Sequence, residues 1–164
     1  PVAPFASRLI HLDAVPLENW ESPGKKIPLR YREVSLALGA KPNTPTGVGG
    51  HPFDLEVGKL APGQCGCPYH CHSSQWELFL LRSGTATVRT PAGTQVFGPG
   101  DIVLHPPGEA HRFTNTGPDE LLYSLVADNP PTDIWHYPDS KKWGHSTTRD
   151  FFRMTSANYW DGEE

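Results

Sequence analysis

The sequence predicts an all-β domain, and three observations support this prediction. The chain of 164 residues contains 18 prolines, about twice the average share of ~5%. These prolines stand at short intervals, which leaves little room for long helices. The chain also contains 16 glycines, and short apolar segments of about five to eight residues lie between these turn formers. Strands of that length separated by tight turns are therefore expected.

The pattern is most regular between residues 53 and 128, where eight consecutive segments have the composition of strands. Each is bounded by Gly, Pro, Asn or Ser. The segments are FDLEVGKL, PYHCH, WELFLLR, TATVRT, TQVFG, DIVLH, HRFTN and ELLYSLVAD. Their near-regular spacing favours a sandwich or barrel built from antiparallel hairpins, with TPAGT as one hairpin turn.

The flanking regions have weaker patterns. Residues 1–52 are predicted to be an N-terminal extension whose substantial apolar segments are RLIHL and LRYREVSLAL, the second of which fits a short helix or a strand. Residues 129–164 form a polar and aromatic tail without helical periodicity, which we expect to pack across the barrel. The length suits one domain over residues 1–164, with its barrel core at about 53–128.

Composition limits the possible partners and the location. Charged residues make up 20% of the chain and the net charge is −4, so no basic field is available to hold nucleic acid. No apolar run is long enough to cross a bilayer, and a secretory signal is absent. Three cysteines crowded into seven residues favour a reducing compartment over a disulfide scaffold. We expect a cytoplasmic protein that binds small molecules or further copies of itself, with neither nucleic acid nor membrane as partner.

Four polar side chains form a candidate metal site. Side chains alternate between the faces of a strand, so His70 and His72 point the same way and Cys71 points the other way. After a turn, Glu77 can face the same interior, and a further segment brings His111 with Asn115 on its face. Three imidazoles and one carboxylate suit a divalent transition metal and leave positions open for water or substrate.

The spacing of these residues resembles the two motifs of the cupin superfamily. In the first motif a His-x-His pair is followed after four residues by Glu and after six more by Gly. Here these positions are His70, His72, Glu77 and Gly84. The second motif corresponds here to Gly100, Pro106, Gly108, His111 and Asn115. The one departure is Gln64, which stands where the first motif has a glycine.

The resemblance has several implications. It implies a cupin double-stranded β-helix, also called a jelly-roll barrel, with irregular N- and C-terminal extensions. It implies one divalent transition metal ion, Mn, Fe, Ni or Zn, held by His70, His72, Glu77 and His111, and it implies a homodimer. The tail segments HYPDSKKWG and NYWDGEE are similar to those that follow the barrel in small single-domain bacterial cupins, some of which are labelled sugar-phosphate isomerases.

Two alternatives to this ligand set are open. Cys65, Cys67 and Cys71 could build a closed zinc site with the neighbouring histidines, since thiolate and imidazole are the usual ligands of structural zinc. His105 could replace His111 as the last ligand, although the motif spacing favours His111.

The expected function follows from the site. Phe79 and Phe113 share the interior face with the ligands and are predicted to line a substrate pocket, where Tyr123 could donate a hydrogen bond. We expect a metal-dependent enzyme that acts on a small oxygen-rich metabolite, with a sugar or sugar-phosphate isomerase as one form. The alternatives are an Fe-dependent dioxygenase and a non-catalytic small-molecule-binding cupin. No cluster of Lys or Arg that would cradle a phosphate is apparent, and the catalytic residues stay unassigned.

Overall fold

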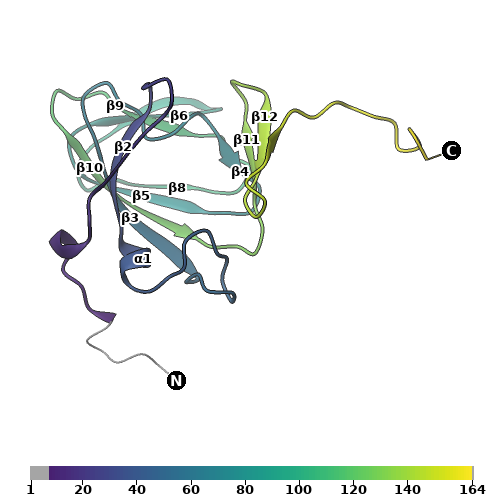
Figure 1. Ribbon diagram of the computed structural model, residues 1–164. Coiled ribbons are helices and arrows are strands. Elements are labelled where there is room, and N and C mark those ends of the chain that lie inside the picture. Colours follow the sequence, from purple (N-terminus) through teal and green to yellow (C-terminus); the bar gives the residue numbers. More distant parts are fainter. Residues whose placement is uncertain (1–7, 164) are drawn as a thin grey trace.

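The computed structural model describes residues 8–163 and shows a barrel of antiparallel strands with a separate hairpin at one side (Figure 1). Its largest sheet has six strands in the order β1-β2-β3-β10-β5-β8. A sheet of three strands, β7-β6-β9, contributes the second layer of the barrel, and four short strands form the third sheet, β13-β12-β11-β4. The fold is the jelly-roll type that the sequence predicts.

The eight predicted segments all form strands. Their bounds are β3 (Phe53–Leu60), β4 (Cys71–His72), β5 (Glu77–Ser83), β6 (Ala86–Thr90), β7 (Gly93–Phe97), β8 (Ile102–His105), β9 (Arg112–Asn115) and β10 (Leu121–Asp128). The alternation of apolar residues is the physical reason. Along β5, for example, Glu77, Phe79 and Leu81 are buried while the residues between them are more exposed. Period-two patterns of this kind fix which face of a strand enters the core.

The N-terminal extension contributes more regular structure than its weak pattern suggests. The segment LRYREVSLAL is both strand and helix, since β2 (Pro28–Glu33) runs directly into the single-turn helix α1 (Val34–Ala37). A short helix, η2 (Leu12–Ala14), and β1 (Glu18–Glu21) precede β2. Because β2 pairs with β3, the extension widens the large sheet, and Tyr31 and Glu33 of β2 line the cavity that is described below.

A compact apolar core lies between the two sheets of the barrel. Its buried members come from β3, β5, β6, β7, β9 and β10: Leu60, Phe79, Leu81, Ala86, Val88, Phe97, Phe113, Leu121 and Tyr123. Gly84 makes the turn between β5 and β6 with a φ of 87°, a conformation that glycine adopts without the usual steric cost. A side chain there would also meet the backbone of Leu121 at 3.0 Å.

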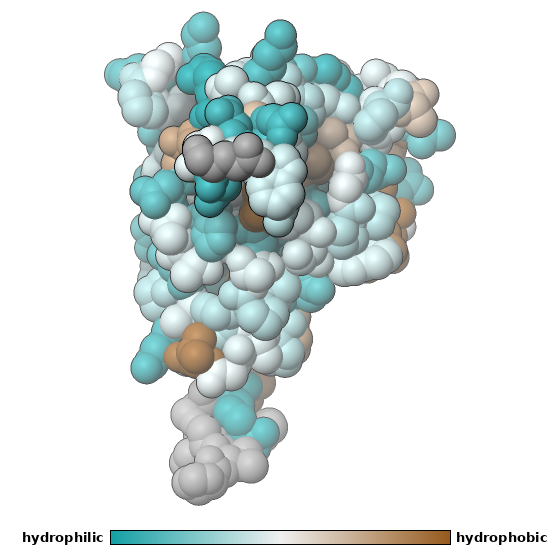
Figure 2. Space-filling model, turned by 90° about the vertical axis from the view of Figure 1, so that its right-hand side faces the viewer, coloured by the Kyte–Doolittle hydropathy of each residue, from teal (hydrophilic) through white to brown (hydrophobic). Residues whose placement is uncertain are grey.

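The C-terminal tail packs on the barrel only through its first half. The strands β11 (Ile134–Tyr137), β12 (Lys142–His145) and β13 (Phe151–Phe152) form a small sheet, and β11 pairs with β4. Beyond β13 the chain is exposed and leads away from the body, in yellow in Figure 1. Figure 2 looks at the side from which this segment projects, and most of that surface is hydrophilic. Among the described residues no helix has the length and apolar character needed to cross a membrane.

Candidate metal centre and cavity

His70 and His72 reach the barrel interior from two neighbouring backbone pairings. His70 forms an isolated antiparallel bridge with His111, with reciprocal N–H to carbonyl hydrogen bonds of 3.2 and 2.8 Å. His72 lies in β4 opposite Trp135 of β11. The extended backbone places the two side chains on one face, as the spacing predicts, and the pairings hold that face toward the interior.

Glu77 and His111 complete the cluster from other strands. Glu77 begins β5 and pairs with His105 of β8 and with Ala127 of β10, so the central part of the large sheet fixes its position. His111 directly precedes β9 and is 1% exposed. Three side chains from residues 70–77 thus lie close to a fourth that follows 34 residues later.

Three of the groups, His70, Glu77 and His111, lie close enough to share one cation, and His72 lies beside two of them. The Nε2 atoms of His70 and His72 are 3.1 Å apart, and the Oε2 atom of Glu77 lies 2.8 Å from Nε2 of His111 and 3.6 Å from Nε2 of His72. Ligand bonds of about 2.1 Å at right angles would separate neighbouring donor atoms by about 3 Å. The ligand atoms of His70, Glu77 and His111 all lie within 4.8 Å of one another, and His72 adjoins two of them.

The hydrogen bonds on the far side of each imidazole strengthen this fit. Nδ1 of His70 lies 2.9 Å from the carbonyl oxygen of Pro68, and Nδ1 of His111 lies 3.2 Å from that of Glu109. Nδ1 of His72 lies 2.6 Å from a carboxylate oxygen of Asp133. For His70 and His72 these oxygens accept, so Nδ1 donates and the neutral ring keeps its lone pair on Nε2. Nε2 of His111 lies 2.8 Å from the Glu77 carboxylate, which accepts, so without a metal ion this nitrogen carries a proton that a bound cation would displace.

The electrostatics of the cluster favour an ionised Glu77 and a neutral His70, the states that metal ligands need. Burial lowers the pKa of His72, but its hydrogen bond with Asp133 and the charge of Glu77 outweigh this and raise it. Burial alone would raise the pKa of Glu77, but its hydrogen bond with His111 and the other imidazoles outweigh this and lower it to about 2. Burial also lowers the pKa of His70 to about 4, with His72 and His111 acting in the same direction. An ionised carboxylate beside a neutral imidazole is therefore the ground state of this site at neutral pH.

The alternative ligands have other partners. His105 is buried, its Nδ1 lies 2.7 Å from Glu109, and its ring stacks on His111 with centroids 3.8 Å apart. His105 therefore packs against the ring of the candidate ligand His111. Cys65, Cys67 and Cys71 are free thiols, and among residues 8–163 none of them joins a cluster of metal-ligating groups.

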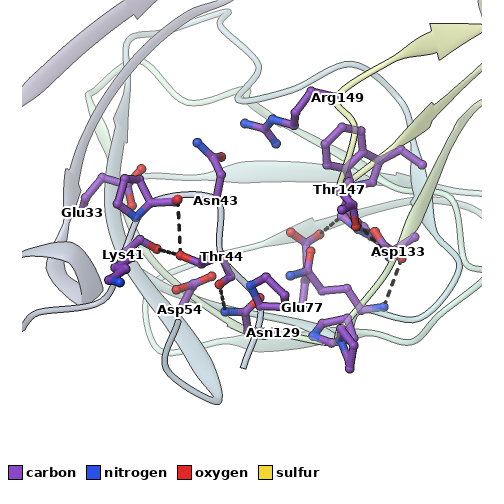
Figure 3. A pocket seen from close by; sticks show the side chains of 18 of the residues that line it. Glu33, Lys41, Asn43, Thr44, Asp54, Glu77, Asn129, Asp133, Thr147 and Arg149 are labelled. Carbon is purple, nitrogen blue, oxygen red and sulfur yellow. Dashed lines mark hydrogen bonds and ion pairs between the residues drawn. The ribbon is translucent and has the colours of Figure 1, made fainter. Parts of the chain in front are cut away.

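A polar cavity of about 570 Å³ opens in front of the cluster and includes His70, His72 and Glu77 in its wall. Figure 3 shows Glu33, Lys41 and Asp54 on one side of it and Asp133, Thr147 and Arg149 on the opposite side. One wall thus comes from the N-terminal extension and the other from the C-terminal tail. The space is large enough for a small metabolite.

The predicted pocket residues Phe79, Phe113 and Tyr123 lie elsewhere. All three belong to the buried core, and the wall of the cavity does not contain them. Phe79 and Phe113 each follow a candidate ligand by two residues, so they share its face but lie about 7 Å further along the strand. Their ring centroids are 4.9 Å apart, and that of Tyr123 is 4.8 Å from Phe113. The three rings form an aromatic layer beneath the site rather than a wall of the pocket.

Several site residues could not be found from the sequence. Asp133 contacts His72, and Tyr137 lies nearly parallel to the ring of His70 with centroids 5.9 Å apart. Both belong to the tail, where Asp133 lies outside any recognised segment and Tyr137 lies in HYPDSKKWG, whose resemblance assigns it no role. Glu33 and Asp54 come from the adjacent strands β2 and β3, and their inward direction depends on the register between those strands. Sequence spacing carries no signal for such contacts.

Comparison with known proteins agrees with this architecture. Residues 47–127 match the family model of the cupin domain. The barrel of this chain is therefore a cupin domain, and its solved structural neighbours have the cupin fold. No curated protein matches the chain.

Two similar solved structures cover nearly the whole chain. One is a protein from Acidithiobacillus ferrooxidans, provisionally described as a sugar phosphate isomerase, with a TM-score of 0.76, 17% identity and coverage of 94% of this chain and 100% of its own. Another is a sugar phosphate isomerase of the cupin superfamily from Silicibacter pomeroyi, with a TM-score of 0.73, 19% identity and coverage of 92% and 97%. The polyketide cyclase RemF from Streptomyces resistomycificus has a TM-score of 0.55, 24% identity and coverage of 75% and 81%. At these identities the similarity shows the fold alone.

Proposed function

We propose that this chain is a metal-dependent enzyme that isomerises a small sugar or sugar phosphate. The observation that carries the proposal is the cluster of His70, Glu77 and His111, with ligand atoms within 4.8 Å of one another and with His72 beside it, next to a polar cavity whose wall includes His70, His72 and Glu77. A bound divalent cation supplies a Lewis acid that polarises a carbonyl group. The two neighbours described as sugar phosphate isomerases are consistent with this chemistry.

The cavity also offers groups that could move a proton. Aldose–ketose isomerisation requires a base that removes a proton from one carbon and returns it to its neighbour. Glu33 and Asp54 line the cavity, and burial raises the pKa of both, with the charge of Asp54 also raising that of Glu33. A carboxylate with a raised pKa is a stronger base, so we assign the proton transfer to one of these two residues rather than to Glu77.

The cavity wall further supports an anionic substituent on the substrate. Lys41 and Arg149 stand in opposite walls, and Arg149 lies above the ring of Trp135 with its guanidinium carbon 5.3 Å from the centroid. Guanidinium and ammonium groups bind phosphate through charge-assisted hydrogen bonds. Each of these cations offers a phosphate group a partner from its own wall, and this supports a sugar phosphate as one class of substrate.

Two measurements test the proposal. Elemental analysis of untagged protein should find about one transition metal ion per chain. With aldose phosphates in deuterated water, the protein should then incorporate deuterium at the carbon next to the carbonyl. The variants Glu33→Gln and Asp54→Asn should keep the metal, and at least one of them should lose the exchange. Glu21→Gln, an exposed change on β1, serves as the matched control.

Each of the other expected functions has its own signature. Bound iron together with oxygen consumption on a catechol or thiol would establish the dioxygenase instead. Stoichiometric binding of a sugar phosphate without any exchange, in metal-loaded protein, would establish a non-catalytic binding protein. Absence of metal at good yield would refute the proposed enzyme.

A further inference from the structure

A buried carboxylate from the tail stands directly behind one candidate ligand. Asp133 lies just before β11 and is 4% exposed. Its Oδ2 atom is 2.6 Å from Nδ1 of His72, the shortest contact that any of the site histidines makes through Nδ1. The other two site histidines use backbone carbonyl oxygens at this position, so among the three only His72 has its Nδ1 held by a side chain.

The other carboxylate oxygen of Asp133, Oδ1, accepts hydrogen bonds from a different set of donors. Oδ1 accepts hydrogen bonds from the backbone N–H of Ser74 at 2.9 Å and the hydroxyl of Ser73 at 3.2 Å, and the N–H of Gln75 is 3.4 Å away. These donors belong to the turn that connects His72 to Glu77. The Asp133 carboxylate therefore contacts both the candidate ligand His72 and the turn that sets the distance between His72 and Glu77.

The backbone of Asp133 is itself held in place. Its N–H donates to the hydroxyl of Ser146 at 2.8 Å, and its carbonyl oxygen accepts from the N–H of Ser146 at 2.9 Å. Immediately after it, Trp135 pairs with His72 across β11 and β4. With backbone and side chain both fixed, Asp133 has little freedom to follow a movement of His72, and it imposes its position on the imidazole.

We propose that Asp133 is a positioning residue of the metal centre, which it completes from outside the barrel by holding His72 in the tautomer whose Nε2 lone pair faces the ion. The proposal rests on the metal-binding function proposed above. A carboxylate behind a histidine ligand orients the ring and increases its basicity, and loss of such a partner typically costs about 10- to 100-fold in metal affinity. The C-terminal tail would accordingly be part of the metal site.

The substitution Asp133→Asn separates this role from a merely structural one. The amide oxygen should keep the position of Oδ1, because the N–H of Ser74 and the hydroxyl of Ser73 need an acceptor there. The amide nitrogen then faces His72 and offers a proton, so Nδ1 must accept and the ring proton moves to Nε2. The loop contacts survive while the lone pair that would bind the ion is blocked.

The test uses the metal-free full chain and Zn²⁺ as the probe, with affinity measured by competition against a chelator. Asp133→Asn should weaken Zn²⁺ binding by about 10- to 100-fold. Nitrogen-15 NMR of the imidazoles should show His72 protonated on Nδ1 in the wild type and on Nε2 in the variant. Asp139→Asn is the matched control, since this exposed aspartate of the same tail pairs with Arg89 and not with a candidate ligand, and it should bind Zn²⁺ as the wild type does.

A double variant tests whether Asp133 acts through His72. His72→Ala keeps three donor groups, so a weaker Zn²⁺ affinity stays measurable. In that background Asp133→Asn should cause no further loss, because interacting residues are non-additive. The assignment of Asp133 would be wrong if Asp133→Asn weakened Zn²⁺ binding equally in the wild type and in His72→Ala. It would also be wrong if the tautomer of His72 were unchanged in Asp133→Asn. Failure of the wild-type chain to bind Zn²⁺ would instead refute the metal site itself, so the two failures are distinguishable.

Discussion

Replacing Phe79 with alanine tests whether the aromatic layer beneath the site is core or pocket. Phe79 is 4% exposed and its ring packs against Phe113, Tyr123, His105 and His111 at centroid distances of 4.9 to 6.0 Å. Truncation of a buried phenylalanine leaves a cavity and costs about 3–5 kcal/mol. For a domain of this size, 1 kcal/mol corresponds to about 2–4 °C in Tm, so Phe79→Ala should lower Tm by roughly 6 to 20 °C.

Urea denaturation and thermal unfolding of the metal-free protein are the suitable assays. Tyr159→Ala is the matched control, because this aromatic residue is 82% exposed and its loss should change the free energy of unfolding by less than about 0.5 kcal/mol. The reasoning would be wrong if Phe79→Ala cost less than about 1 kcal/mol but sharply weakened ligand binding. That result would return Phe79 to the pocket wall, where strand alternation alone had placed it.

Three further predictions concern the site, the acidic interior and the assembly. His72→Ala should release most of the bound metal. Its far-ultraviolet circular dichroism should stay that of the wild type, because strand pairing and core packing stabilise the barrel. The ring of His136 stacks on Trp143, so the control variant His136→Ala should keep the metal. Burial, followed by the charge of Glu33, raises the pKa of Glu56 to about 8. Unfolding between about pH 4.5 and 8 therefore releases a proton, and stability should fall as pH rises through this window. In Glu56→Gln, the free energy of unfolding, measured by denaturation across this pH window, should fall less steeply as pH rises. An unchanged dependence on pH would mean that Glu56 ionises normally in the folded protein. Sedimentation equilibrium should give twice the 18.1 kDa mass of one chain if the expected homodimer forms, and a monomer mass at micromolar concentration would exclude it.

The barrel strands could be predicted because local patterns determine them. In β3 and β10 the alternation of apolar residues and the flanking turn residues bound the strands at residues 53–60 and 120–128; the structure has the first of these limits unchanged and begins the second strand one residue later. The site residues His70, His72, Glu77 and His111 could be named for a related reason. A strand fixes the relative direction of residues two apart, so spacing within a motif already carries geometric information.

Depth within the barrel could not be predicted in this way. Phe79 and Glu77 share one face of β5, yet one lies in the core and the other at the cavity. The alternation of apolar residues predicts which face of a strand a side chain lies on. It does not predict where along the strand the opposite sheet covers that face. The LRYREVSLAL segment shows a similar limit, since its strand half is stabilised by pairing with β3 rather than by its own pattern.

The sequence by itself determined the class of fold, the strands of the barrel and two motifs that contain four candidate donor groups, because each strand and each motif depends on residues close together in the chain. Only the tertiary structure decided what surrounds those donors. It brought Asp133 from the tail to His72, Glu33 from the N-terminal extension to the cavity, and Lys41 and Arg149 to opposite walls. These contacts join segments separated by many residues, and their formation depends on strand register and sheet order, which no local pattern encodes.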